Sequence, residues 1–414
     1  MEKKLNKHKM MIIPKYGNDF YPADTLNFED DRGKIVYYGL RNDFPTYIIE
    51  LYNKSAINAT AINAIKDGII GNGLTTENEQ VLEIANRDGE SWNDIFKKVA
   101  LDRALFGGFA VEVIWSNDRT KITDVYHIDF SYVRAHRCNE RGITPGYYIS
   151  NEFQNKGRLR VKDEDVTYIP RFNKLDRSSP SQIYYYNPYR PGMRYYPLPD
   201  YTGGLNIIAL DAEIDNFHKN NIANGLAPSL SITTFTDADN EEREAIERQL
   251  RSAYAGSNNA GSLIYMDVAS KDEAPIITPI PQNGADGYYT TVNDMVLQKI
   301  LTSHRITSPM LVGIKTDGQL GGRTEMLEAM ALFQKNVIEP KQSDILSVFE
   351  ELFMVNGYDK PIGVDTTRLF DDGEKTEVVT SIDADAGEDK ILEDSIETKE
   401  VTPDLNINEN KGIV

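Results

Sequence analysis

The sequence predicts an α+β protein with more than one packed region. Apolar residues recur at helical spacing in several long segments, and short runs of β-branched and aromatic residues stand between Asp, Asn and Gly. The strands do not alternate regularly with helices, which argues against a repeating βαβ pattern. At 414 residues, the chain also exceeds the size at which one core usually stops growing.

The first helix is predicted from Pro45 to Gly68, with apolar residues along one side. The two glycines in Ile69–Leu74 suit a tight turn with positive φ. Binding of a phosphate there is an alternative, but the Lys and Ser/Thr of a P-loop are missing. Ser91 and Asp94 predict the start of a second helix, which should stop at Gly107.

Strands should dominate the following region. Phe109–Trp115 is rich in β-branched and aromatic residues, which suit a pleated surface. Shorter strands are predicted at residues 123–128, 132–136, 147–150, 158–161 and 166–169.

Residues 178–201 contain seven tyrosines interleaved with five prolines and two arginines. Aromatic and Arg side chains together can stack on single-stranded bases or on sugar rings. The alternative is a rigid connection whose tyrosines bury ring faces against a neighbouring domain or subunit while their hydroxyls contact water.

A second group of helices follows. Residues 206–224, 239–254 and 288–306 have helical periodicity, and residues 262–266 form an apolar strand. In the first of these helices the apolar positions are three or four residues apart, as in a seam that packs against other helices. The residues predicted to form such a seam between subunits are Ile207, Leu210, Ile214, Phe217, Val292, Val296 and Ile300.

Residues 307–322 contain one Pro and four Gly and are predicted to form a loop. Helical periodicity resumes from Arg323 to Asn356. Pro340 falls inside that pattern and should kink the helix, because it lacks an amide hydrogen and its ring clashes with the preceding turn.

Charge is distributed unevenly along the chain. The formal net charge is −19, and residues 371–414 carry 14 Asp or Glu against 4 Lys, a net of −10. We expect this acidic tail to be disordered unless a partner orders it. With Cys138 as the single cysteine, no disulfide can form within the chain. No apolar run is long enough for a membrane span, so no membrane contact is expected.

The order of these features resembles that of tailed-bacteriophage portal proteins, which form the head-tail connector ring. Residues 62–74 and 102–114 look like the first helices and strand of the portal wing, and Tyr168–Arg171 looks like its closing strand. Residues 300–313 are the most family-like stretch. The resemblance covers residues 45–355, most of the chain.

The resemblance implies a portal fold with an α/β wing, a two-helix stem, a small α/β clip, a long kinked helix and a reduced or disordered crown. The implied divisions are an N-terminal arm (1–44), wing (45–202), first stem helix (203–224), clip (225–287), second stem helix (288–306), tunnel loop (307–322), kinked wing helix (323–357) and crown remnant with acidic tail (358–414).

Portal proteins assemble as a dodecameric ring at one capsid vertex, through which DNA enters and leaves. The resemblance therefore implies a homo-oligomer in the virion, assembled in the bacterial cytoplasm. Its expected partners are double-stranded DNA, terminase, head-tail adaptor, major capsid protein and scaffold. The residues expected to face DNA are Lys315, Thr316, Asp317, Gln319, Arg323 and Lys219. For the basic ones, ordinary surface charge is the alternative.

Two other classes of protein compete with this interpretation. An enzyme is disfavoured because the five histidines are scattered and no Gly-x-Ser-x-Gly or His-Glu-x-x-His motif occurs. No catalytic residue, metal site or cofactor is therefore predicted, and a DNA-processing enzyme stays a minor alternative. A carbohydrate-binding or adhesion module built on the tyrosine-rich segment is the other alternative, although the N-terminus lacks a signal-peptide pattern.

Overall fold

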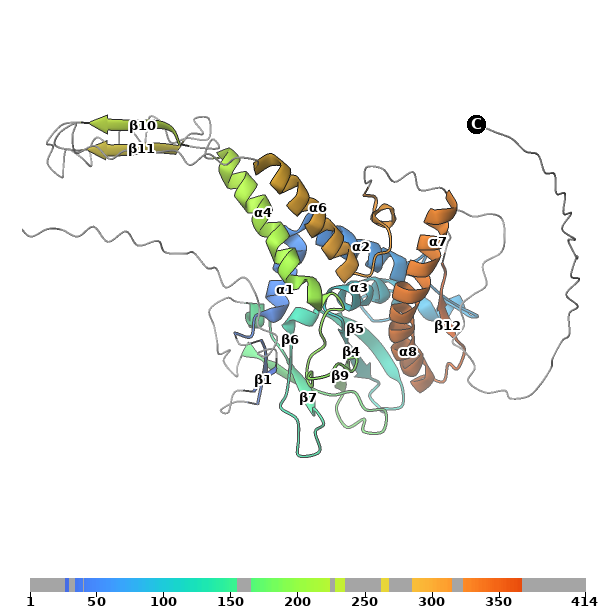
Figure 1. Ribbon diagram of the computed structural model, residues 1–414. Helices are drawn as coiled ribbons and strands as arrows, with labels where there is room; N and C mark the ends of the chain where they lie inside the picture. The colour runs from blue at the N-terminus through green and yellow to red at the C-terminus, as the bar shows by residue number, and fades with distance from the viewer. Residues whose placement is uncertain are drawn as a thin grey trace, which may run out of the picture. The chain divides into compact units, whose positions relative to one another are not determined.

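A computed structural model describes residues 27–29, 34–39, 41–154, 165–223, 228–234, 262–267, 285–314 and 323–366 (Figure 1). The chain divides into residues 1–380 and 381–414, and the second part lies outside the described residues. The predicted strand at 158–161, the predicted helix at 239–254 and the acidic tail from 371 also lie outside them.

Two helices stand where one was predicted. α1 spans Phe44–Lys54 and α2 spans Ala56–Ile70. Ser55 separates them: its backbone is extended, and its hydroxyl accepts a hydrogen bond from the amide of Asn58 and so caps α2. The predicted end at Gly68 was also wrong, because α2 continues to Ile70 and the expected glycine turn follows it, with positive φ at Gly71 and Gly73.

The third helix and the strand after it agree with the prediction. α3 spans Trp92–Leu105, and Ser91 and Asp94 form a reciprocal capping pair at its start. Gly107 has φ +82° and turns the chain into β4, Phe109–Trp115.

Two three-stranded sheets form the centre of the fold. In the first, β4 lies between β5 (Ile122–Ile128) and β9 (Ser181–Tyr186), and both pairings are antiparallel. In the second, β7 (Gly146–Ile149) lies between β6 (Val133–Ala135) and β8 (Thr167–Pro170). β9 was not predicted: its sequence was interpreted as a connection because prolines and tyrosines surround it.

Part of the predicted N-terminal arm belongs to the body of the protein. β1 (Asn27–Glu29) and β2 (Val36–Tyr38) pair antiparallel. Tyr38 is buried and its ring stacks on that of Tyr196, with centroids 4.1 Å apart. Residues 36–38 therefore pack with the body, although the prediction had placed them in an N-terminal arm.

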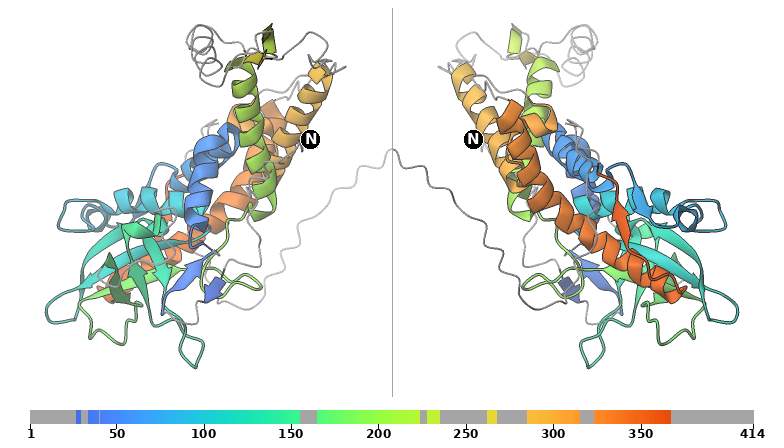
Figure 2. Two further views of the ribbon diagram at one scale, coloured as in Figure 1. Left: turned by 90° about the vertical axis from the view of Figure 1, so that its left-hand side faces the viewer. Right: turned by 90° about the vertical axis from the view of Figure 1, so that its right-hand side faces the viewer.

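Two long helices and a pair of strands follow the sheets. α4 spans Leu205–Ala223 and α6 spans Ala285–Ser303, and the two helices lie side by side (Figures 1 and 2). Between them in sequence, β10 (Pro228–Thr234) and β11 (Ser262–Asp267) pair in parallel. Within the predicted clip, residues 225–287, the structure describes these two strands and the start of α6, and the division itself stays a prediction.

The last long helix is interrupted. α7 (Arg323–Phe333), a π-helical segment η9 (Gln334–Ile338) and α8 (Glu339–Val355) follow one another (Figure 2). The chain then returns to the body, where β12 (Ile362–Val364) pairs antiparallel with β3 (Leu74–Thr76). The prediction had placed residues 358–366 in a crown remnant, whereas in the structure residues 362–364 form a sheet with β3.

Candidate functional site: the helix pair and its base

The helix pair α4 and α6 has one face inside the protein and one outside. Leu205, Ile208, Ala209 and Ala212 of α4 are buried, whereas Glu213, Asp215 and Lys219 are exposed. α4 also contacts α1, and α6 contacts α2, so the body holds the pair from both sides.

The predicted subunit-contact residues divide into three groups. Four are half-buried and leave part of their apolar surface exposed on the single chain: Ile207, Leu210, Ile214 and Val292. Val296 and Ile300 are only 1% and 0% exposed, so they are core residues and offer no surface to a neighbouring copy. An apolar stripe in sequence does not distinguish a partner within the chain from one outside it. The side chain of Phe217 lies outside the described residues.

Few of the predicted DNA-facing positions fall in the described part of the chain. Lys219 is exposed on α4. Arg323 begins α7, with its side chain outside the described set. Lys315, Thr316, Asp317 and Gln319 lie in residues 315–322, which the structure does not describe. The short η8 helix, Pro309–Val312, leads into that segment.

Pro340 occupies the first turn of α8, directly after the π-helical segment. The amide of Glu339 donates to the carbonyl of Gln334, five residues earlier. Proline has no amide hydrogen and cannot make the ordinary i to i−4 hydrogen bond. In the wider π turn the hydrogen bonds run to the residue five positions earlier, so the helix tolerates proline at this point. The prediction at Pro340 was a kink, and what the structure shows is a π-helical segment just before the proline.

The start of α4 and the end of α6 approach closely at Gly204. A Cβ atom at Gly204 would lie 2.5 Å from Cβ of Ser303, closer than two carbon atoms can pack. Gly204 is buried and ends the 3-10 turn η6 (Thr202–Gly204) that leads into α4. Glycine is therefore required here for close helix approach.

We expect Gly204→Ala to destabilise the protein by roughly 1–3 kcal/mol, because the added methyl overpacks the base of the helix pair. Chemical denaturation would measure this. Ser303→Gly in the same chain removes the opposing Cβ and should restore part of the loss, whereas Gly203→Ala, at an exposed position with open space, should have little effect. Equal losses from Gly203→Ala and Gly204→Ala would contradict the packing explanation.

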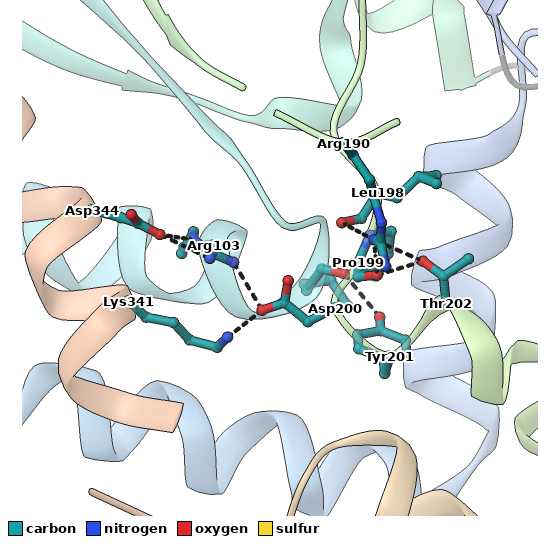
Figure 3. Close-up of polar contacts among 10 residues, drawn as sticks. Arg103, Arg190, Leu198, Pro199, Asp200, Tyr201, Thr202, Lys341 and Asp344 are labelled. Carbon is teal, nitrogen blue, oxygen red and sulfur yellow. Dashed lines mark hydrogen bonds and ion pairs between the residues drawn. The ribbon is translucent and has the colours of Figure 1, made fainter. Parts of the chain in front are cut away.

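A cluster of charges with two buried cations joins the segment before α4 to α3 and α8 (Figure 3). Arg103 donates to Asp344 at 2.8 Å and to Asp200 at 3.2 Å, and Lys341 also donates to Asp200. Arg103 and Lys341 side chains are only 7% and 8% exposed. Burial lowers the pKa of Lys341, while that of Asp200 is lowered because its two cationic partners outweigh its own burial. Removal of any one of these charges would therefore leave a partner without its counter-charge.

His304 lies beside this cluster, just after α6. Its Nε2 is 2.8 Å from Oδ1 of Asn58 in α2, and its ring stacks on Tyr201 at 4.4 Å. On the other side of the base, Ser55 donates to Asp211 of α4 at 2.6 Å. Together these contacts fix both helices of the pair to α2.

The tyrosine-rich segment packs mainly within the chain. Tyr195, Tyr196 and Tyr201 are buried, and the hydroxyl of Tyr201 donates to the carbonyl of Leu105 at 2.8 Å. The prediction that ring faces are buried was right, but the packing is within the chain. The hydroxyls of Tyr195, Tyr196 and Tyr201 bond to protein groups, whereas the buried hydroxyl of Tyr185 has no hydrogen-bond partner among the described residues. Tyr189, 91% exposed, is the exception.

The described residues hold no group of three or more His, Cys, Asp or Glu arranged to bind a metal ion. His127 contacts Asp102 at 2.8 Å, and His136 stacks on Tyr148. Among the helices that the structure describes, none is long and apolar enough to cross a membrane.

No family model matches the chain. The "Probable portal protein" of Haemophilus phage HP1 (strain HP1c1) is 24% identical over 203 residues, which cover 47% of this chain and 57% of that protein. The match thus spans little more than half the length of that relative.

Solved structures share the fold across most of the chain. A chain in the virion of a native gene transfer agent particle has a TM-score of 0.53 at 14% identity, covering 80% of this chain and 86% of its own length. A chain in the neck of the native particle, computed with C12 symmetry, has a TM-score of 0.50 at 14% identity and covers 77% and 83%. The chain has the fold of these particle proteins. The match to the phage protein confirms the resemblance to portal proteins that was drawn from the sequence, and the solved structures show the shared fold.

Proposed function

We propose that this chain is the subunit of a portal ring, the conduit through which DNA passes at one vertex of a virion. The observation that carries the proposal is the helix pair: α4 and α6 are fixed to the body at their base, yet keep apolar side chains such as Ile207 and Ile214 half-exposed. A head-to-tail contact that closes on itself would bury this surface in a ring.

The sequence similarity to a portal protein and the fold shared with a chain of a C12-symmetric neck support this proposal. A dodecamer is the stoichiometry we propose. Terminase, adaptor, capsid and scaffold proteins would then be its partners, and the role is structural and not enzymatic.

The charges on the outer face of the pair suit a conduit. Glu213, Asp215 and Asp294 are exposed there together with Lys219 and Lys299. Each phosphate that a protein neutralises adds affinity and salt dependence, so a wall with few cations would let a duplex slide.

Electron microscopy of the purified full-length chain tests the proposal. We expect rings with a central channel, and sedimentation velocity should report a large assembly. A monomer at high protein concentration, at both low and high salt, would overturn the proposal.

Shortening the segment Lys315–Gly321 should leave ring assembly intact and reduce packaged or retained DNA severely, because this segment is proposed to contact DNA and not neighbouring subunits. Particle assembly in a complementation system, with DNA content measured by nuclease protection, checks this. Removing the seven residues 405–411 from the remote tail is a length-matched control. Loss of rings in the shortened variant would show that the segment is structural.

A further inference from the structure

A cavity of about 610 Å³ opens between α2, η8 and the junction of α7 with η9. Leu311, Val312 and Met330, which are half-buried, supply the accessible part of its apolar wall, and Phe333 and Ile338 of the same lining are buried. Asn63, Asp67 and Asn72 line its polar side. The carboxylate of Asp67 is 68% exposed and pairs with Lys66 at 3.0 Å. A segment that fits this groove should combine large apolar side chains with a cation.

The chain leaves the described fold at this groove. Thr366, the last described residue, is part of the lining. Its position is fixed by Asp365, whose amide donates to the carbonyl of Gly73 at 2.9 Å and whose carbonyl accepts from the amide of Asn72 at 2.7 Å. A Cβ at Gly71 would lie 2.5 Å from the carbonyl oxygen of Asp365, so the glycine permits this close approach.

The residues that follow Thr366 match the groove in chemistry. They read Thr367-Arg368-Leu369-Phe370, and Asp371 then opens the acidic tail. Four residues reach at most about 14 Å, which is enough to cross a groove of this size but not to reach a distant surface. Because the segment is tethered at the rim, its effective concentration there is of the order of millimolar before any contact forms.

We propose that residues 367–370 of the same chain occupy this groove, with Leu369 and Phe370 against the apolar wall and Arg368 beside Asp67. The segment then anchors the acidic tail, so that residues 371–414 start from a fixed point on the α2–α7 face. A neighbouring copy is the rival occupant, but it has no tether. The proposal concerns contacts within one chain and does not depend on ring assembly.

Cysteine crosslinking tests the proposal in the full-length chain. Cys138→Ser removes the native thiol, and Asn63→Cys with Asp371→Cys places one thiol in the groove and one just past the segment, leaving Leu369 and Phe370 in place. Mild oxidation should give a crosslink within the chain in high yield. Adding Leu369→Ser and Phe370→Ser should lower that yield about tenfold, because the apolar anchors are gone.

Asp385→Cys in place of Asp371→Cys is the control for random encounter of a tethered thiol, and should crosslink poorly. A crosslink between two chains would assign the groove to a neighbour's tail and overturn the proposal. No crosslink, or one that persists without Leu369 and Phe370, would also overturn it.

Truncation gives an independent measurement. A chain ending at Phe370 should keep the Tm of the full chain, whereas a chain ending at Thr366 should melt about 4 °C lower, since two apolar side chains leave the groove. Equal Tm values for the two truncated chains would contradict the proposal.

Discussion

Arg103→Met is expected to lower the free energy of unfolding by roughly 3–5 kcal/mol, because it removes one partner from a buried set of ion pairs. Arg103 donates hydrogen bonds to both Asp200 and Asp344. Methionine fills similar space without charge, so both carboxylates would lose a cation. Asp200 is 43% exposed and Asp344 28% exposed, which lets water offset part of the loss and places the effect near the lower value.

Urea denaturation at pH 7 measures this loss. Lys360→Met is a matched control, because Lys360 pairs with Glu77 at 3.2 Å on the surface, where ion pairs contribute little. In a double-mutant cycle, Asp344→Asn should cost less in the Arg103→Met background than alone, since the pair is already broken. Additive losses would indicate that the pair of Arg103 with Asp344 contributes nothing to stability.

The sequence did not predict this cluster of ion pairs. Lys341 follows Pro340 in an amphipathic helix, where a lysine is ordinarily solvated, and nothing in the sequence indicates that it meets Asp200, which is 141 residues away. The tyrosine-rich segment before Asp200 was the one indication of a packed region here, because a stretch dense in aromatic and proline residues is expected to bury its ring faces. We predicted burial there but not the strand or the ion pairs.

Local structure was predictable wherever neighbouring residues determine it. The sequence predicts the start of α3 from Ser91 and Asp94 and a strand from the β-branched and aromatic residues of Phe109–Trp115. The structure confirms both. Ser55 was missed because apolar periodicity continues across it. Its hydroxyl caps α2 through the amide of Asn58 and also donates to Asp211 in α4, a contact that the sequence does not show. Val296 and Ile300 show the same limit at the helix pair: the core partners that bury them come from elsewhere in the chain.

His304→Gln should make the protein less sensitive to acid. Burial, and then the nearby charge of Lys341, lower the pKa of His304 to about 3 from its ordinary 6.5. Between pH 6.5 and 3 the unfolded chain binds a proton that the folded chain does not, so stability falls as the pH falls through this window. At pH 5 the loss amounts to about 2 kcal/mol relative to pH 7.

A second buried group opposes this effect, so the difference between two proteins is the quantity to measure. Burial raises the pKa of Asp102 to about 6, and acidification below that value therefore adds stability to the folded state. Asp102 is present in both wild type and His304→Gln, and its contribution cancels when their unfolding free energies are subtracted at each pH.

We expect that difference, wild type minus variant, to fall by about 2 kcal/mol between pH 7 and pH 5. Asp200, whose pKa is lowered, stays ionised throughout and does not titrate in this range. The glutamine side chain of the variant can still donate to Asn58 but loses the ring contact with Tyr201, so a constant loss at every pH is compatible with the expectation. A difference that does not change with pH would show that His304 stays neutral in both states or charged in both. In that case the burial of His304 would not contribute to the acid sensitivity of the protein.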